Sequence, residues 1–310
     1  MRIGMTVGLG LRSESTMDSL ASRVETLAAR GFATVWMPCG SGFDPLTALP
    51  VAGRATAGIE LGTAIMPTWP RHPAALAQQA LTADDALRGR LTLGIGASHE
   101  VMMSHDLGIP FERPARHTRE YLSVLGPLLA GEPACFRGEV FSVETQLLIR
   151  RGARVVPVLL AAMGPAMLRL AGAATTGTIT SWTGPRTIAD YIVPAISAAA
   201  QAAGRPAPRI VVGLPIGLTA DPDGLRARLA RQTGFYESLP SYQATRDREG
   251  VAALADLAIL GDEAHLDAAL ARLADGGATD FAAQLLPLDE STAARTTEFL
   301  ASRAAARVAG

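Results

Sequence analysis

The sequence predicts one α/β domain, residues 1–310, in which eight parallel strands and their helices form a (β/α)8 barrel, with loop insertions after strands four and seven. Short apolar runs alternate with longer helical patterns along the whole chain, which is typical of parallel strands joined by crossover helices. The 310 residues exceed the roughly 250 of a typical barrel and leave a surplus for insertions. Because no linker or composition shift divides the chain, the barrel ranks ahead of a doubly wound open sheet.

The first half of the chain predicts four strands with helices between them. Short apolar runs place the strands at residues 2–7, 34–37, 59–64 and 91–95. Longer periodic segments place helices at residues 17–30, 45–57 and 73–87. Gly31 follows the first helix, where a C-terminal cap glycine is common.

The alternation stops after strand four. Residues 96–117 are polar and contain several glycines and prolines, which predicts an insertion or active-site loop before a helix at residues 118–129. In the segment 136–141 an Arg-Gly-Glu turn lies between apolar residues, which predicts an appended β-hairpin.

The second half resumes the alternation. Strands are expected at residues 156–161, 177–180, 210–218 and 280–286, and helices at 165–173, 188–203, 263–275 and from Ser291 onward. Residues 225–260 are expected to form a long helical excursion after strand seven. A barrel with this order has its active site in the loops at the C-terminal ends of the strands.

Charge and composition indicate a small-molecule partner. The 28 basic and 29 acidic side chains leave a formal charge of −1, so nothing suggests a nucleic-acid or anionic-membrane surface. Every basic side chain is an arginine, which excludes Schiff-base and lysine general-base chemistry. Cys39 and Cys135 are too few for a disulfide framework, and with no signal peptide or membrane-length apolar run they fit a reducing cytoplasm.

The five histidines predict no metal site. They show neither the HxH nor the HExxH spacing of metal-dependent hydrolases, so that class of barrel enzyme is disfavoured. His117 and His265 lie in helical contexts and are interpreted as surface or capping residues. His105 belongs to the polar insertion, from which it can approach a substrate.

Three strand ends carry the chemistry. Residues 62–73 follow strand three with three prolines, Trp69, Arg71 and His72, a set that suits a pocket wall or a rigid turn. After strand four, Gly94 and Gly96 allow a flat ring or a phosphate to approach the backbone, without forming a Rossmann fingerprint.

His99 and Glu100 follow those glycines directly, although either residue alone is more often on the surface. After strand five, Gly164 and Pro165 open a helix whose free N–H groups form an anion site or an ordinary turn.

Together these segments resemble the bacterial-luciferase-like flavin and deazaflavin oxidoreductases over nearly the whole chain. The most specific motifs are the Arg-His-Pro of residues 71–73, the run 89–96, and residues 161–165 with 170–172, all in the family's order and spacing. The resemblance is nearest to the branch that uses the deazaflavin coenzyme F420, which includes methylenetetrahydromethanopterin reductase-like and glucose-6-phosphate dehydrogenase-like members.

The resemblance implies that F420 lies across the barrel mouth, over a non-prolyl cis peptide that joins Ala64 to Ile65. It also implies a homodimer. Backbone N–H groups of Met163 and Gly164 are expected to bind the coenzyme phosphate. The residues expected beside the ring or its side chain are Gly96, Ala97 and Ser98.

The chain departs from the family's pattern at the residues that would supply or accept the substrate's proton. Many relatives carry a polar pair such as Asp-His after strand two, whereas this chain has Pro38, Cys39 and Gly40. The candidates for the missing acid or base are therefore His99, Glu100 and His72, or solvent. His99 falls where the sugar-phosphate dehydrogenases carry an acidic catalytic residue, and Cys39 offers a weak S–H donor to the ring.

The predicted function is hydride transfer between F420 and a small organic substrate, either by reducing an activated C=C or C=N bond or by the reverse oxidation. Trp36, Trp69 and Trp182 lie near strand ends and form either a substrate pocket or core packing. Two alternatives remain: an FMN-dependent monooxygenase on the same scaffold, and a catalytically silent coenzyme-binding barrel. Substrate choice is expected to lie in residues 101–117 and in the excursion after strand seven.

Overall fold

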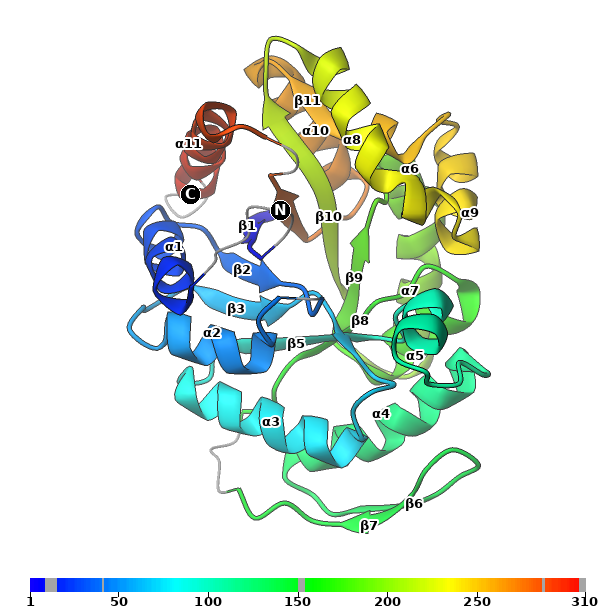
Figure 1. The fold of residues 1–310 in the computed structure, drawn as a ribbon. Coiled ribbons are helices and arrows are strands. Elements are labelled where there is room, and N and C mark those ends of the chain that lie inside the picture. Colours follow the sequence, from blue (N-terminus) through cyan, green and yellow to red (C-terminus); the bar gives the residue numbers. More distant parts are fainter. Residues whose placement is uncertain (9–15, 41, 150–153, 286–287, 307–310) are drawn as a thin grey trace.

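The computed structural model describes residues 1–8, 16–40, 42–149, 154–285 and 288–306. Within them eight parallel strands close into a barrel that helices surround (Figure 1). Neighbouring strands follow in the order β1 (Arg2–Thr6), β2 (Thr34–Met37), β3 (Glu60–Thr63), β5 (Leu91–Gly96), β8 (Val158–Leu160), β9 (Gly177–Ser181), β10 (Arg209–Leu218) and β12 (Asp280–Gln284). Because β12 pairs in parallel with β1, the sheet is closed and the predicted (β/α)8 barrel is confirmed.

The helices cover the outside of the barrel. They are α1 (Met17–Ala29), α2 (Pro45–Gly53), α3 (Pro73–Ala86), α4 (Pro114–Ala130), α5 (Pro165–Ala174), α6 (Pro185–Thr187), α7 (Val193–Ala202), α10 (Glu263–Asp275) and α11 (Glu290–Ala306). Side-chain caps fix several starts: the Thr16 hydroxyl accepts from the Ser19 N–H at 3.1 Å, and Asp262 accepts from the His265 N–H at 2.8 Å. None of the described helices is long and apolar enough to cross a membrane.

The excursion after β10 is only partly helical. It contains α8 (Pro222–Glu237), α9 (Pro240–Glu249), the 3-10 turn η3 (Leu254–Leu257) and a short strand, β11 (Ile259–Gly261). The prediction of helix through residue 260 is therefore wrong. The reason is tertiary: β10 extends past the barrel, and its residues Ile216 to Leu218 pair in parallel with β11 (Figure 1).

Other boundaries also differ from expectation, among them the end of α2 at Gly53, four residues before the predicted end. The predicted helix 188–203 begins as a π-helix, η2 (Ile188–Ile192), and Pro194, which has no N–H to donate, lies at its junction with α7. Helix α4 begins at Pro114, four residues before the predicted start. Leu286, predicted as the end of strand eight, lies outside the described residues.

The predicted hairpin is present as an antiparallel pair, β6 (Ala134–Arg137) and β7 (Ser142–Thr145). The buried carboxylate of Glu120 on α4 holds its turn by accepting from the N–H groups of Glu139, Val140 and Phe141 at 3.1, 2.8 and 3.1 Å. These charge-assisted bonds fix the hairpin against α4.

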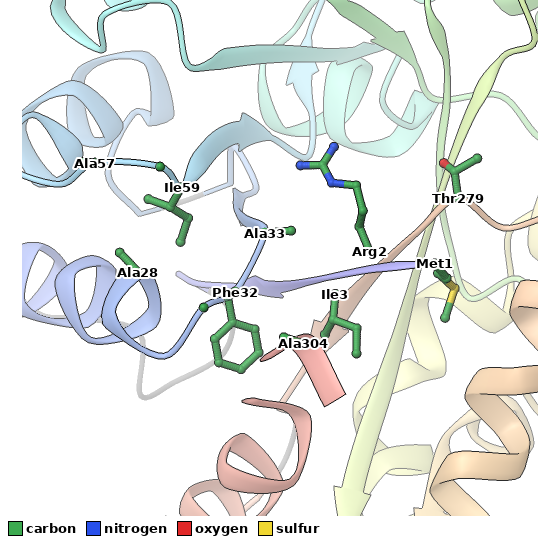
Figure 2. Close-up of a pocket in the computed structure, with 12 residues that line it drawn as sticks. Met1, Arg2, Ile3, Ala28, Phe32, Ala33, Ala57, Ile59, Thr279 and Ala304 are labelled. Carbon is green, nitrogen blue, oxygen red and sulfur yellow. The ribbon is translucent and has the colours of Figure 1, made fainter. Parts of the chain in front are cut away.

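An ion cluster fills the N-terminal end of the barrel. Arg209 lies 2.6 Å from both Glu60 and Asp280, and its guanidinium is 5.4 Å from the centre of the Trp36 ring. A Cβ on Gly62 would collide with that ring. A cavity of about 610 Å³ at the same end is lined by residues including Met1, Phe32 and Ile59, as Figure 2 shows. It lies at the beginnings of the strands, opposite the loops expected to carry chemistry.

Candidate active site

Three strand ends converge at the C-terminal side of the barrel, where Gly96 packs closely against Ile65 and Ala161. A Cβ on Gly96 would lie 3.0 Å from the Cβ of Ala161 and 3.1 Å from Cδ1 of Ile65. The Thr68 N–H donates to the Gly96 carbonyl at 3.0 Å, which ties the short strand β4 (Met66–Pro67) to the end of β5. We call Ile65, Gly96 and Ala161 the barrel floor.

The expected cis peptide between Ala64 and Ile65 is present. The Ala64 N–H donates to the Met37 carbonyl at 2.8 Å, and the Cys39 N–H donates to the Ile65 carbonyl at 3.3 Å. The structure thus brings Cys39, from the end of β2, beside the barrel floor.

A cluster formed by Cys39, Arg71 and Asp44 borders this floor. One guanidinium nitrogen of Arg71 lies 3.9 Å from the Cys39 Sγ, and the other lies 2.6 Å from the Asp44 carboxylate. Burial raises the pKa of the Cys39 thiol, and the nearby Arg71 offsets this only in part. The thiol therefore keeps its proton at neutral pH. Sequence reasoning missed Asp44; the available signal was its position before Pro45, where an aspartate caps α2.

His99 lies half-buried among three aromatic rings. Its imidazole centre is 6.0 Å from that of Phe235, 6.1 Å from Tyr236 and 5.9 Å from Tyr242, all on α8 and α9. Burial lowers the pKa of His99, so its neutral form prevails at neutral pH. Glu100, the next residue, is exposed and precedes the π-helix η1 (Val101–Asp106).

Ser98 and Ala97 continue from the barrel floor toward His99. Ser98 adopts a φ of +65°, a left-handed conformation that costs energy outside glycine, and its Oγ lies 3.8 Å from the Met102 sulfur. This turn points the chain from β5 toward α8 and α9.

The structure gives His72 a different position. Its side chain is exposed, its Nδ1 accepts from the Ala74 N–H at 3.3 Å at the start of α3, and its ring meets Phe141 at 5.8 Å. Capping of α3 accounts for His72. Of the three proposed acid–base residues, only His99 is both partly buried and at the end of a barrel strand.

The three tryptophans do not share one pocket wall. Trp36 is fully buried in the barrel interior, so its position supports core packing. Trp182, with a φ of +56°, is 5% exposed, and its backbone N–H donates to the Gly213 carbonyl at 3.0 Å. Trp69 is half-buried and stacks on His117 at a centroid distance of 3.9 Å.

His117 corrects a sequence prediction. It is not a surface or capping residue, because it is only 4% exposed, and both ring nitrogens lack a hydrogen-bond partner. The reason is that α4 starts at Pro114, which turns His117 in its first turn toward Trp69. His265 is exposed in the first turn of α10, and His105 is exposed with its Nδ1 3.0 Å from Asp106.

A polar pair lies between the ends of β9 and β12. The Gln284 side-chain amide donates to the Ser181 Oγ at 3.3 Å, and Gln284 is 8% exposed. Sequence reasoning missed both residues. A glutamine at the end of an otherwise apolar strand was the signal.

Helix α5 begins with an open N-terminus. Gly164 is its cap residue and has no side chain to bond the first N–H groups, while Pro165 occupies the first helical position. A Cβ on Gly164 would meet no atom within 4 Å. The free N–H groups and the positive end of the helix dipole favour an anion here.

The comparison that decides the family covers most of the chain. The profile described as "Luciferase-like monooxygenase" matches residues 2–296. The chain belongs to the luciferase-like monooxygenase family. Membership confirms the resemblance inferred from the motifs. No group of three or more metal-ligating side chains occurs among the described residues of this luciferase-like protein.

Two relatives of this luciferase-like chain are named as oxidoreductases, and one of these names states F420 dependence. An F420-dependent glucose-6-phosphate dehydrogenase of Nakamurella multipartita is 30% identical over 230 residues, which cover 72% of this chain and 66% of the relative. A 5,10-methylenetetrahydromethanopterin reductase of Methanolobus tindarius is 26% identical over 230 residues, covering 74% and 69%. The chain thus spans about two thirds of the length of each relative.

A solved structure supports the same fold. The F420-dependent tetrahydromethanopterin reductase from Methanopyrus kandleri superposes with a TM-score of 0.80 at 20% identity, covering 97% of both chains. At that identity the match concerns the barrel and its connections.

Proposed function

We propose that this protein is an F420-dependent oxidoreductase that transfers a hydride between the coenzyme and a small organic substrate, in the direction that reduces an activated C=C or C=N bond. The observation that carries the proposal is the close packing of Ile65, Gly96 and Ala161 in the barrel floor, where residue 96 has no side chain. The name of the Nakamurella multipartita relative, an F420-dependent dehydrogenase, supports the choice of coenzyme.

The residues present fit this coenzyme. The barrel floor takes the ring, and the open start of α5 at Met163 and Gly164 takes the phosphate through backbone N–H groups. Ala97 and Ser98 border the side chain or the ring, and the Cys39 thiol offers its S–H at the ring edge. When bound, F420 supplies a carbon that carries two electrons as a hydride.

The protein's own task is to orient the two carbons, exclude water and supply one proton. In the protonated form, the His99 imidazole supplies the proton that completes a reduction, since His99 follows the end of β5 by three residues and is partly buried. Glu100 is exposed and His72 caps α3, which leaves His99 as the acid that the geometry favours. The near-neutral chain charge supports a small-molecule partner, and the resemblance supports a cytoplasmic homodimer.

An anaerobic assay tests this function. Purified protein is mixed with reduced F420 and 2-cyclohexen-1-one without oxygen, and the return of the oxidised coenzyme's absorbance is followed. We expect turnover that His99→Ala lowers at least tenfold, while His105→Ala, which changes a histidine with an 85% exposed side chain, leaves it unchanged.

Three results would contradict the proposal. Oxygen uptake with reduced FMN and no F420 turnover would favour the monooxygenase. Binding of F420 without turnover of enone, imine, alcohol or sugar phosphate would favour the silent barrel. Equal rates for His99→Ala and the unmodified protein would remove His99 as the proton donor.

A further inference from the structure

The excursion after β10 presents aromatic rings to the candidate site. Phe235, Tyr236 and Tyr242 surround His99, and Tyr236 contacts both other rings at centroid distances of 5.4 and 5.3 Å. We call these three residues the aromatic wall. Tyr242 is buried, Tyr236 is half-buried and Phe235 is 39% exposed, so the rings run from the interior out to the surface.

Hydrogen bonds hold the aromatic wall in place. The Glu237 carboxylate accepts from the Leu254 N–H at 2.6 Å and pairs with Arg246 at 3.0 Å, which joins α8 to α9 and to η3. Since Glu237 follows Tyr236 directly, these bonds fix the end of α8 from which the rings project. A pre-ordered aromatic surface binds apolar ligands without a large ordering cost.

Two arginines of the candidate site and its surroundings are already paired with carboxylates. Arg246 is paired with Glu237, and Arg71 by the barrel floor is paired with Asp44 at 2.6 Å. A phosphate dianion needs cations or several N–H donors that are free to reach it. Arg231, exposed on α8 one helical turn before Phe235, is the cation that we test for such a substrate.

His99 supplies a hydrogen-bond donor at the inner edge of the aromatic wall. A neutral imidazole presents one N–H donor, and its protonated form presents two. The aromatic faces bind an apolar ring, and an imidazole N–H at their inner edge can hydrogen-bond a carbonyl oxygen or an imine nitrogen on that ring.

We propose that the substrate is an uncharged, mainly apolar ring compound, of the cyclic enone or cyclic imine class, that packs on the aromatic wall while His99 hydrogen-bonds its heteroatom. This inference rests on the proposed function. It assigns substrate selection to Phe235 and Tyr236, and it distinguishes this protein from the relative named for glucose 6-phosphate.

The test measures KM values of the unmodified protein and its variants, with reduced F420 for enone reduction and oxidised F420 for oxidation of glucose 6-phosphate. The KM for 2-cyclohexen-1-one should rise about tenfold in Phe235→Ala, the expected loss for removing one aromatic contact. The KM for the acyclic but-3-en-2-one should change less than about threefold, because it reaches the wall less. Arg231→Gln, at an exposed residue outside the aromatic wall, should leave the KM for the cyclic enone unchanged.

Contrary outcomes separate the two proposals. If Phe235→Ala leaves the cyclic enone KM unchanged, the aromatic wall does not bind the substrate. If the protein oxidises glucose 6-phosphate with F420, and Arg231→Gln raises that KM, the substrate class is wrong while the F420 function stands. If the protein turns over F420 with neither compound, both the proposed substrate class and the proposed F420 function are wrong.

Discussion

Gly96 lies directly against Ala161 across the C-terminal end of the barrel, and a Cβ on Gly96 would be 3.0 Å from the Cβ of Ala161. The same Cβ would lie 3.2 Å from Cγ1 of Ile65. Two strand ends therefore meet with no space between them for a further side chain. A planar ligand lying on this floor depends on the absence of a side chain at residue 96.

Gly96→Ala should weaken F420 binding at least tenfold, because the added methyl group must displace Ile65 or Ala161 from the floor. Titration monitored by the coenzyme's fluorescence measures the dissociation constant. Gly126→Ala is the matched control: Gly126 lies inside α4, a Cβ there meets no atom within 4 Å, and helix propensity predicts about 0.5–1 kcal/mol of stabilisation with unchanged affinity. Equal affinities for the two variants would argue against the floor as the ring site.

Gly164→Asp should lower F420 affinity while preserving the fold. The backbone at Gly164 (φ −101°, ψ 161°) suits any residue, and an aspartate there would cap α5 and place a negative charge where the phosphate is expected. Gly164→Asn caps the helix without the charge. We expect the dissociation constant to rise at least tenfold for Asp and less for Asn, with unfolding temperatures at or above that of the unmodified protein. Equal losses for both variants would show that bulk, not charge, is what the site rejects.

The pH profile of reduction tests His99. Because burial lowers the pKa of His99 below its ordinary 6.5, its protonated form disappears at a lower pH than that of an exposed histidine. The kcat/KM for enone reduction should therefore fall as pH rises through a pKa below 6.5. His99→Ala should remove this limb, and His105→Ala should keep it. An apparent pKa above 6.5 would assign the proton to another group.

His117 should make stability depend on pH in mildly acidic solution. Burial lowers the pKa of His117 to about 4, so the unfolded chain binds a proton that the folded chain refuses. Stability is complete above pH 6.5 and falls as pH decreases toward 4, by about 2–3 kcal/mol. His117→Phe keeps a ring against Trp69 and removes two unpartnered nitrogens, so it should flatten the profile between pH 6.5 and 4. Urea unfolding at pH 5 and 7 measures this, and an unchanged slope would contradict it.

The ion cluster of Arg209, Glu60 and Asp280 at the N-terminal end of the barrel should make stability depend on pH in a lower range than His117 does. Burial alone would raise the pKa of Glu60, but Arg209, with smaller contributions from Thr92 and Arg2, outweighs burial and holds the pKa below its usual value of 4.5. Its stabilising contribution is complete above that value and is lost as pH falls through the folded pKa. Arg209→Met should cost up to about 3–5 kcal/mol, because it leaves the buried carboxylates of Glu60 and Asp280 to share the half-exposed Arg2.

Adding Glu60→Gln to Arg209→Met should recover part of that loss, since one uncompensated charge is removed. Denaturant unfolding at pH 7 measures both variants. A double variant no more stable than the single one would contradict the coupling between Arg209 and Glu60.

Local patterns predicted the barrel because each strand–helix unit leaves its own signal. The run ending at Gly96 and the Gly164–Pro165 helix start are readable from a few neighbouring residues. Contacts between distant segments leave no such signal. Asp44 pairs with Arg71 across 27 positions, and His117 on α4 stacks on Trp69, which lies 48 positions earlier in the sequence.

The excursion after β10 shows the same limit. Its helical composition was readable, but β11 forms only because β10 extends far enough to pair with it. The placement of Tyr236 and Tyr242 around His99 likewise depends on how α8 and α9 fold back, which no local pattern contains.

A crystal structure of the complex with oxidised F420 tests the central claim most directly. We predict that the deazaflavin ring lies on Ile65, Gly96 and Ala161, with a phosphate oxygen within hydrogen-bonding distance of the first N–H groups of α5. A coenzyme found at the cavity near Met1, or with its phosphate away from Gly164, would contradict it.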